Sequence, residues 1–143
     1  MTQNNTSISV GLGTRSYDIH IGGGLIATAG TLASPFITNR HLVIITDHSV
    51  KAAHGQRLVD ALQATARKID ILTVPAGEAS KSIAIYGGLL DDILALGVDR
   101  STVIIAFGGG VIGDLAGYVA ATLLRGVDLI QIPTSLLAQV DSS

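Results

Sequence analysis

A glycine-rich turn carries the clearest chemical meaning in the sequence. Gly108, Gly110 and Gly113 fit the pattern G-x-G-x-x-G, directly after an apolar β-type run and before a run of small residues. Glycines at such a turn let the backbone approach a pyrophosphate, and the free N–H groups at the helix start then face the anion. The pattern alone is weak, because glycines also let a helix pack closely on a sheet.

Two features depart from the usual dinucleotide-binding pattern. The turn follows a late strand rather than the first, and Asp128, at about the spacing of the usual ribose-binding acid, begins a strand instead of ending one. Close packing therefore remains an alternative explanation for the glycines taken alone.

Charged side chains follow the ends of several predicted strands. Asp114 is expected in the first turn of the glycine helix, where the helix dipole would stabilise a carboxylate by about 0.3–1 kcal/mol, or where it could reach a ribose or substrate hydroxyl. Glu78 and Lys81 follow a strand that ends at Val74 and would face the crevice where ligands bind; a solvated helix start is the alternative. Asp47 ends another strand, where a ribose contact and a helix cap are equally compatible with the spacing.

Other polar residues give weaker indications. Arg125 closes the glycine helix and is followed by Gly126, as expected of an ordinary helix C-terminus. The four histidines are scattered without ligand spacing, so the sequence predicts no metal site in this stretch. His20 and His41 are expected at the surface or at strand ends.

The apolar pattern predicts an α/β, Rossmann-like fold with a mostly parallel sheet, helices on both faces and an N-terminal β-hairpin, because runs that are apolar on both faces alternate with helical periodicity. The hairpin is predicted from the alternation of Ile8 and Val10 with Tyr17, Ile19 and Ile21. Strands are predicted over 41–46, 69–74, 102–107 and 127–132. Helices are predicted over about 25–32, 50–62, 111–124 and 135–140, and the first of them is expected to end before Pro35. A further helix is predicted from an N-cap at Ser80, with an apolar stripe between Ile83 and Leu94 and an end at Gly97.

The composition excludes several classes of protein. A net charge of −2 with 14% charged residues gives no electrostatic case for nucleic acid or acidic lipid. Cysteine is absent, which excludes disulfides and thiolate chemistry. The mean hydropathy of +0.52 is high, and the run 102–124 is long enough for a bilayer. The central glycines of this run favour a strand, a turn and a helix, so we expect an apolar interface with a partner rather than a membrane span. The polar N-terminus lacks the features of a signal peptide, which predicts a cytoplasmic protein.

Three segments together resemble the 3-dehydroquinate synthases, sugar phosphate cyclases of the shikimate pathway. They are PAGEASKS (75–82), GVDRSTVIIAFGGGVIGDLAGYVAATLLRG (97–126) and IPTSLLAQVDSS (132–143). The similarity is close from about Val74 onward and looser before it. Ser135 stands where the family usually has threonine, and a hydroxyl is retained.

The resemblance implies that residues 1–143 form the N-terminal NAD-binding domain of a longer enzyme. The helical C-terminal domain of the family, with its zinc and substrate site and its zinc-binding glutamate and two histidines, would be absent from this chain, as would the glycine-lysine stretch that follows in the family. The full-length enzyme would use a divalent metal, zinc or cobalt.

The resemblance also assigns roles to individual residues. Asp47, Ser49 and Val50 would hold the adenosine end of NAD, Glu78 and Lys81 would line the cofactor site, Gly109, Gly110 and Val111 would bind the pyrophosphate, and Asp114 the ribose beside it. Thr134, Ser135 and Leu137 match further cofactor positions, with Asp141 and Ser142 near the nicotinamide and the substrate. Asp141 and Arg125 match catalytic positions; the arginine would reach the substrate phosphate of a neighbouring subunit, which implies a homodimer.

The implied reaction converts 3-deoxy-D-arabino-heptulosonate 7-phosphate to 3-dehydroquinate with loss of phosphate and regeneration of NAD. Two alternatives remain: a metal- and NAD-dependent polyol dehydrogenase of the same architecture, and a nucleotide-binding module without catalysis. The segment around Arg125 and the ending 136–143 argue against the first. We expect this chain alone to be inactive, because the implied zinc ligands and half of the cleft lie outside it.

Overall fold

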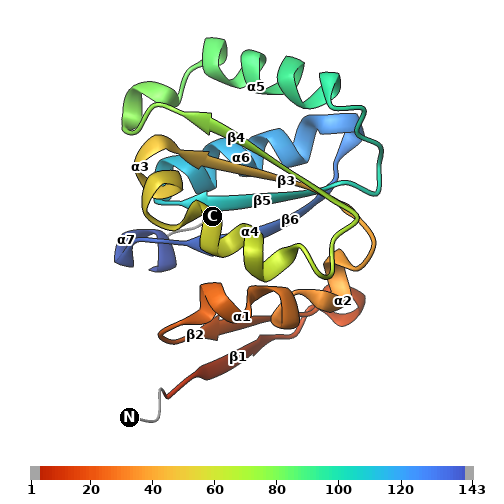
Figure 1. The fold of residues 1–143 in the computed structure, drawn as a ribbon, viewed down its shortest axis with the longest axis vertical. Helices are drawn as coiled ribbons and strands as arrows, with labels where there is room; N and C mark the ends of the chain where they lie inside the picture. Colours follow the sequence, from red (N-terminus) through yellow and green to blue (C-terminus); the bar gives the residue numbers. More distant parts are fainter. Residues whose placement is uncertain (1–3, 141–143) are drawn as a thin grey trace.

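A four-stranded parallel sheet lies at the centre of the protein, in a computed structural model that describes residues 4–140 (Figure 1). Its strands run in the spatial order β4-β3-β5-β6, and all three neighbouring pairs are parallel. The strands are β3 (His41–Asp47), β4 (Lys68–Val74), β5 (Val103–Gly108) and β6 (Asp128–Pro133). The predicted α/β fold with a parallel sheet is confirmed.

The two central strands are buried along almost their whole length. Every residue of β5 is buried, as is every residue of β3 before Asp47, whereas the edge strands β4 and β6 are mostly half-buried. Strands covered on both faces need apolar side chains at consecutive positions, which explains the unbroken β-branched runs in the sequence.

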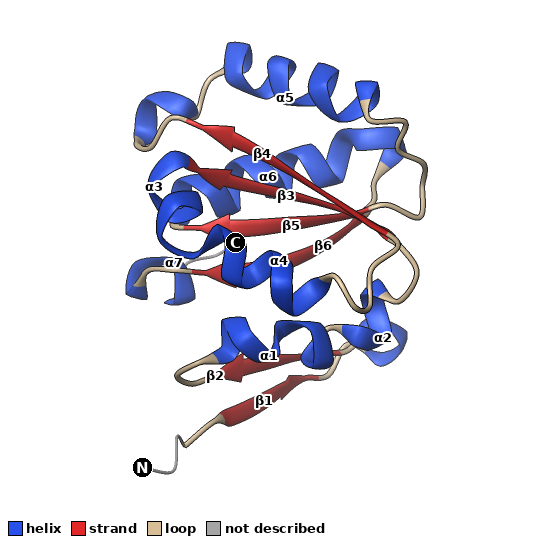
Figure 2. Ribbon diagram, viewed as in Figure 1, coloured by secondary structure: helices blue, strands red, loops and turns tan. Residues whose placement is uncertain are grey.

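Helices cover both faces of the sheet (Figure 2). On one face, Val43, Ile45 and Ile104 pack against α5 (Ile83–Ala95) and α6 (Gly110–Thr122). On the other, Leu42 and Ile44 belong to a second cluster that includes residues of α1 (Leu25–Leu32) and α4 (Gln56–Leu62). Successive strand residues therefore feed two separate hydrophobic cores, as the strand pleat requires.

The N-terminal hairpin lies outside both cores. Strands β1 (Thr6–Val10) and β2 (Tyr17–Ile21) pair antiparallel across the 3₁₀ turn η1 (Gly13–Arg15), as predicted. Figure 1 places β2 towards α1 and β1 on the outside. The sheet is thus flanked by a second small sheet that contributes nothing to the buried clusters.

The helical segments on either side of β3 are divided into more short helices than predicted. A continuous right-handed helical segment comprises α3 (His48–Val50), the π-helical turn η2 (Lys51–Gly55) and α4. Helix α1 spans Leu25–Leu32, as predicted. A further short helix, α2 (Ser34–Ile37), follows it with Pro35 in its first turn, where proline is tolerated.

Two predictions about α5 are wrong. Ser80 does not cap it: this residue is buried in the 3₁₀ turn η3 (Glu78–Ser80), and its hydroxyl donates to the Pro75 carbonyl over 2.5 Å. Ser82 is the N-cap and accepts the Ile85 N–H over 3.2 Å, since the extra turn delays the helix by two residues. The apolar stripe is also narrower than predicted, because Ile83 and Leu94 are exposed. Gly97, with φ +73°, follows the end of the helix as expected.

The end of α6 also differs from the prediction. The α-helix stops at Thr122, and the 3₁₀ turn η4 (Leu123–Arg125) follows it. Leu124 and Arg125 take φ values of +48° and +70°, so Arg125 lies in a left-handed corner rather than at an ordinary helix C-terminus. This corner reverses the chain into β6, and the Val127 N–H closes it on the Ala120 carbonyl.

His41 lies at a strand end, one of the two positions predicted for it, and is buried there. It begins β3, and its Nε2 lies 2.7 Å from Asp70 Oδ2 on the neighbouring strand, where Lys68 Nζ also approaches within 3.1 Å. Burial raises the pKa of the Asp70 carboxyl, but its hydrogen bonds with His41 and Lys68 outweigh burial and hold that pKa below the ordinary value of 3.8. The Asp70 carboxylate, which also pairs with Lys68, thus gives the buried His41 ring a polar partner at this end of the sheet.

The apolar run 102–124 does not form a membrane span. It is divided between β5 and α6, and none of the helices within residues 4–140 has the length and apolar character needed to cross a bilayer.

Candidate functional site

The carboxyl ends of all four parallel strands meet at one edge of the sheet. Asp47 pairs in register with Val74, and Gly108 pairs with Pro133. The chain leaves β3 towards β4 on one side and later returns to place β5 on the other side. Ligands bind in open parallel sheets outside such a reversal of strand order. The candidate residues after β3, β4, β5 and β6 are therefore gathered at the position where this fold class holds its ligands.

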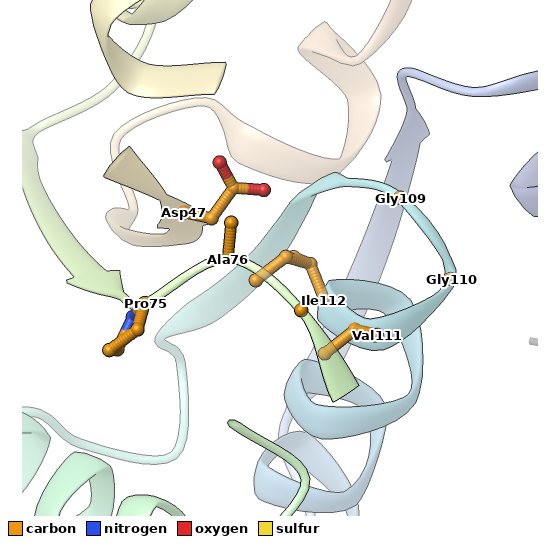
Figure 3. A pocket seen from close by; sticks show the side chains of 8 residues that line it. Asp47, Pro75, Ala76, Gly109, Gly110, Val111 and Ile112 are labelled. Carbon is orange, nitrogen blue, oxygen red and sulfur yellow. The ribbon is translucent and has the colours of Figure 1, made fainter. Parts of the chain in front are cut away.

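A cavity of about 150 Å³ opens at this reversal (Figure 3). It is lined by the end of β3, the loop after β4 and the glycine turn after β5, which contribute Asp47, Pro75, Ala76, Gly77, Gly109, Gly110, Val111 and Ile112. This volume is below the roughly 300–1,000 Å³ of a pocket for a drug-sized molecule. The cavity suits a phosphate-sized group, with the rest of a larger ligand lying outside it.

Backbone N–H groups are the donors that this cavity offers. Helix α6 begins at Gly110, and its N-cap, Gly109, has extended backbone and no side-chain hydrogen bond to the helix. The first N–H groups of any helix have no partner within the helix. An uncapped start, with the positive end of the helix dipole, is an anion-binding arrangement.

The glycines of the turn differ in what they are needed for. A Cβ at Gly108 would lie 2.7 and 2.8 Å from Ile112 Cγ1 and Cβ, so this glycine is required by packing. A Cβ at Gly109 would meet nothing closer than Ser135 Oγ at 3.6 Å, and its φ of −78° is open to any residue. Packing therefore explains Gly108 but not Gly109, which lines the cavity.

Asp47 combines the two roles that the sequence left open. Its Oδ1 accepts the Val50 N–H over 2.9 Å, so it is the N-cap of the helix after β3. It also lines the cavity, and Figure 3 shows its carboxylate beside Ala76 and the glycine turn. Ser49 and Val50 lie in the first turn of the helix that Asp47 caps. The second oxygen of Asp47 leaves an acceptor for a ligand hydroxyl.

Lys81 and Asp114 form an ion pair that the sequence did not reveal. Lys81 Nζ lies 2.6 Å from Asp114 Oδ2 and 3.6 Å from Glu78 Oε2. The hydrogen bond to Asp114 raises the pKa of Lys81 above its ordinary value of 10.5, with a smaller opposing effect of desolvation. The pair joins the loop after β4 to α6 and so bridges two walls of the crevice. Asp114 lies in the second turn of α6, not the first as predicted, because the helix starts at Gly110.

A second hollow of about 250 Å³ extends beyond this ion pair between α5 and α6. Its lining includes Ile83 and the rings of Tyr86 and Tyr118, whose centroids are 4.8 Å apart. Tyr86 Oη lies 2.7 Å from Thr122 Oγ1. Sequence analysis missed this hollow, because each tyrosine reads locally as part of an ordinary apolar stripe and only helix packing brings them together.

The segment after β6 closes the other side of the glycine turn. The Thr134 N–H donates to the Gly108 carbonyl over 2.9 Å. Ser135 Oγ accepts the Ala138 N–H over 3.2 Å and so caps α7 (Leu136–Val140), on which Leu137 is 70% exposed. The other two candidates of this segment, Asp141 and Ser142, lie outside the described residues.

Arg125 and Asp128 lie at the opposite end of the sheet. Helix α6 has 13 residues, which at 1.5 Å each separate Arg125 from the glycine turn by about 20 Å. Asp128 opens β6 and pairs with Arg40 Nη2 over 2.8 Å. Neither side chain reaches the cavity of its own chain. Within residues 4–140, no group of three or more histidine, aspartate and glutamate side chains is placed to hold a metal ion.

Comparisons with known proteins agree with this geometry. Residues 71–143 match the family described as 3-dehydroquinate synthase N-terminal. The 3-dehydroquinate synthase of Rhodospirillum rubrum is 52% identical over 136 residues, and that of Caulobacter vibrioides is 48% identical over 138. The matches cover 95% and 96% of this chain but only 35% and 37% of those enzymes. The chain therefore spans about a third of the length of these relatives.

Solved structures of related enzymes also resemble this chain. A 2-deoxy-scyllo-inosose synthase complexed with carbaglucose-6-phosphate, NAD⁺ and Co²⁺ superposes with a TM-score of 0.82 at 26% identity, over 93% of this chain and 36% of that one. A glycerol dehydrogenase from Schizosaccharomyces pombe reaches a TM-score of 0.56 at 22% identity, over 75% of this chain and 25% of that one, which shows a shared fold alone. With its cavity at the strand reversal and a family match over its second half, the chain belongs to the 3-dehydroquinate synthase family.

Proposed function

We propose that this chain is the NAD-binding part of a 3-dehydroquinate synthase. In the complete enzyme, 3-deoxy-D-arabino-heptulosonate 7-phosphate is cyclised to 3-dehydroquinate and phosphate is released. The relatives at about 50% identity support the assignment of the reaction. The single observation that carries the role of this chain is the uncapped start of α6 at the cavity, where packing does not require the glycine at position 109.

The residues present fit this cofactor. The N–H groups at the start of α6 would bind the diphosphate, at Gly109, Gly110 and Val111, and the free oxygen of Asp47 would accept from the adenosine ribose. Ser49 and Val50 would flank that ribose. Bound NAD supplies a transient oxidation of a ring alcohol, which acidifies the neighbouring C–H bond for loss of phosphate.

The ion pair would orient the other half of the cofactor. Lys81 holds Asp114 in place from the opposite wall, so that the carboxylate would present an oxygen to the second ribose, while Glu78 contacts Lys81 from the same loop. Thr134, Ser135 and Leu137 would close the site from the β6 side. Asp141 and Ser142 are proposed near the nicotinamide and the substrate.

The remaining parts of the enzyme would come from outside this chain. A divalent metal, zinc or cobalt, would be held by residues outside this chain, in the helical C-terminal domain that the resemblance implies. A related cyclase structure contains NAD⁺ and Co²⁺, which supports this requirement. The chain alone is proposed to be inactive, and a cytoplasmic location stays a prediction.

Arg125 is proposed to act on the substrate phosphate in the site of a second subunit. It lies too far from its own cavity to act there, so a role in binding substrate requires a homodimer. Two inactive variants of the full-length enzyme would test this: one carrying Arg125→Ala and the other Gly109→Val. Mixed subunits would contain one intact site and regain activity, whereas an arginine acting within its own chain would give no recovery.

A chimaera tests the reaction itself. Residues 1–140 of this chain would replace the matching residues of the Rhodospirillum rubrum enzyme, and phosphate release from the heptulosonate phosphate would be measured. We expect turnover without net formation of NADH. Net NADH formed from a simple polyol would instead indicate a dehydrogenase, and a folded chimaera that binds NAD but neither releases phosphate nor forms NADH would contradict the proposal.

A further inference from the structure

One side of α6 carries three polar side chains that meet α5 and the loop before it. Asp114, Tyr118 and Thr122 are spaced by four residues, so they lie along one stripe of the helix. Lys81 Nζ lies 2.6 Å from Asp114 Oδ2. The ring of Tyr86 has its centroid 4.8 Å from that of Tyr118, and its hydroxyl lies 2.7 Å from Thr122 Oγ1. The ion pair and the tyrosine pair are therefore neighbouring contacts of one seam between the helices.

The hydroxyl of Tyr86 is the donor in its bond to Thr122. Thr122 Oγ1 lies 2.8 Å from the Tyr118 carbonyl, which can only accept, so the single hydrogen of the threonine hydroxyl points there. The Tyr86 O–H then donates to the threonine oxygen. Two hydrogen bonds in series thus connect Tyr86 to the backbone of α6, and Tyr86→Phe would remove the outer one while keeping the ring.

The beginning of α5 has little burial of its own to hold it in place. Ile83 is 89% exposed, and no residue of the helix before Leu89 is buried. Tyr86 is half-buried against the core, and its N–H donates over 3.0 Å to the carbonyl of Ser82, which directly follows Lys81. The contacts of Tyr86 with α6 therefore fix the backbone about one helical turn away from Lys81.

We propose that Tyr86 is a positioning residue for the ion pair between Lys81 and Asp114. By fixing the first turn of α5 on α6, it keeps the lysine within reach of the carboxylate, and so keeps the carboxylate oriented towards the second ribose of NAD. The consequence for NAD rests on the proposed function. The link between Tyr86 and the ion pair rests on the contacts of the chain alone, so the two can be tested separately.

The state of the ion pair can be measured without NAD. A lysine amine reacts with an acylating reagent in its deprotonated form, and the hydrogen bond to Asp114 holds the pKa of Lys81 above its ordinary value of 10.5. Release of Lys81 should therefore raise its rate of labelling. Mass spectrometry of the 143-residue chain would give this rate relative to that of Lys51, which is exposed on η2, so that a general loss of structure would raise both rates.

Three conservative variants test the seam. We expect Tyr86→Phe to raise the relative labelling of Lys81 about threefold, because amine reactivity follows the deprotonated fraction. Thr122→Val removes the partner hydroxyl from the other helix and should have the same effect. Tyr118→Phe is the matched control: it removes a hydroxyl from the same ring pair but keeps the carbonyl that Thr122 uses, so labelling should not change.

NAD affinity distinguishes positioning from general structural support. Tyr86→Phe should weaken NAD binding about threefold in the unmodified background and not at all in a Lys81→Met background, because its effect passes through the lysine. The proposal is overturned if Lys81 labelling is unchanged, if labelling rises without a loss of affinity, or if the loss is equal in both backgrounds. A chain that does not bind NAD would contradict the proposed function, and the labelling ratio would still decide whether Tyr86 controls the ion pair.

Discussion

The amino and carboxyl ends of the parallel strands form two opposite borders of the central sheet, called here the amino edge and the carboxyl edge. These two borders are built in opposite ways. At the amino edge, Arg40 makes three contacts at once, to the Phe36 and Ser101 carbonyls and to Asp128, and His41 is enclosed with Asp70. At the carboxyl edge, α6 starts without a cap and the space around Gly109 is open. Polar groups are satisfied within the chain at the amino edge, whereas the proposed function assigns the uncapped N–H groups of α6 at the carboxyl edge to the diphosphate.

The largest effect on stability is expected from the amino edge. His41→Ala removes a buried ring and its hydrogen bond to a charged partner, so the free energy of unfolding should fall by about 3 kcal/mol, measured by urea denaturation. His20→Ala, at an exposed position on β2, is the control and should change it by less than about 0.5 kcal/mol. The difference between the edges would be lost if His41→Ala weakened NAD binding while leaving stability unchanged.

Gly108→Ala tests whether this glycine is needed for packing against α6. The added Cβ would press on Ile112 at 2.7–2.8 Å, and because the nearest atoms include the Ile112 Cβ, the helix itself must move. Overpacking of this kind costs about 1–3 kcal/mol, so we expect a loss near 2 kcal/mol in thermal or urea unfolding. An unchanged midpoint would show that this turn adapts more readily than the packing indicates.

Gly109→Ala is the matched change one residue later. Its Cβ has room in the protein, so stability should change by less than about 0.5 kcal/mol. The methyl group would occupy the approach of the diphosphate, and NAD affinity should fall at least tenfold, about 1.4 kcal/mol, in a titration followed by amide NMR shifts. If both substitutions changed stability alike and NAD affinity not at all, the glycines would serve packing only.

Local patterns made the strands and the glycine turn predictable. The buried runs of β3 and β5 and the cap at Asp47 follow from residue types within a few positions. The glycine pattern could not separate packing from binding, because that distinction depends on which atoms lie near each Cα in three dimensions. The contrast between Gly108 and Gly109 supplies it.

Contacts between segments that are distant in the chain could not be predicted from the sequence. The Lys81–Asp114 pair joins residues 33 positions apart, and the contact of His41 with Asp70 joins two strands. Ser80 was misassigned as a cap for a related reason: its hydroxyl reaches back to Pro75, so the 3₁₀ turn takes the place of the first helical turn.

Acid should affect the amino edge through Asp70. Because the folded-state pKa of this carboxyl lies below its ordinary value, the stabilisation is fully present well above pH 3.8 and is lost as the pH falls below 3.8 towards the folded-state pKa. Asp70→Asn should therefore cost about 1 kcal/mol at neutral pH, with a difference from the unmodified chain that shrinks in acid. A difference that stays constant down to the acid transition would show that the carboxylate charge contributes nothing.

The smallest effect is expected from the ion pair at the carboxyl edge, which distinguishes a binding device from a stabilising one. Lys81 and Asp114 are both 38% exposed, so their coupling in a double-mutant cycle of Lys81→Met and Asp114→Asn should contribute little to stability, because solvent screens exposed ion pairs. The same cycle read in NAD affinity should give the larger coupling, because Asp114 can present its oxygen to the ribose only while Lys81 holds it. Should the coupling be larger in stability than in affinity, the pair would belong with the closed network of the amino edge, and the division of labour between the two edges would fail at this point.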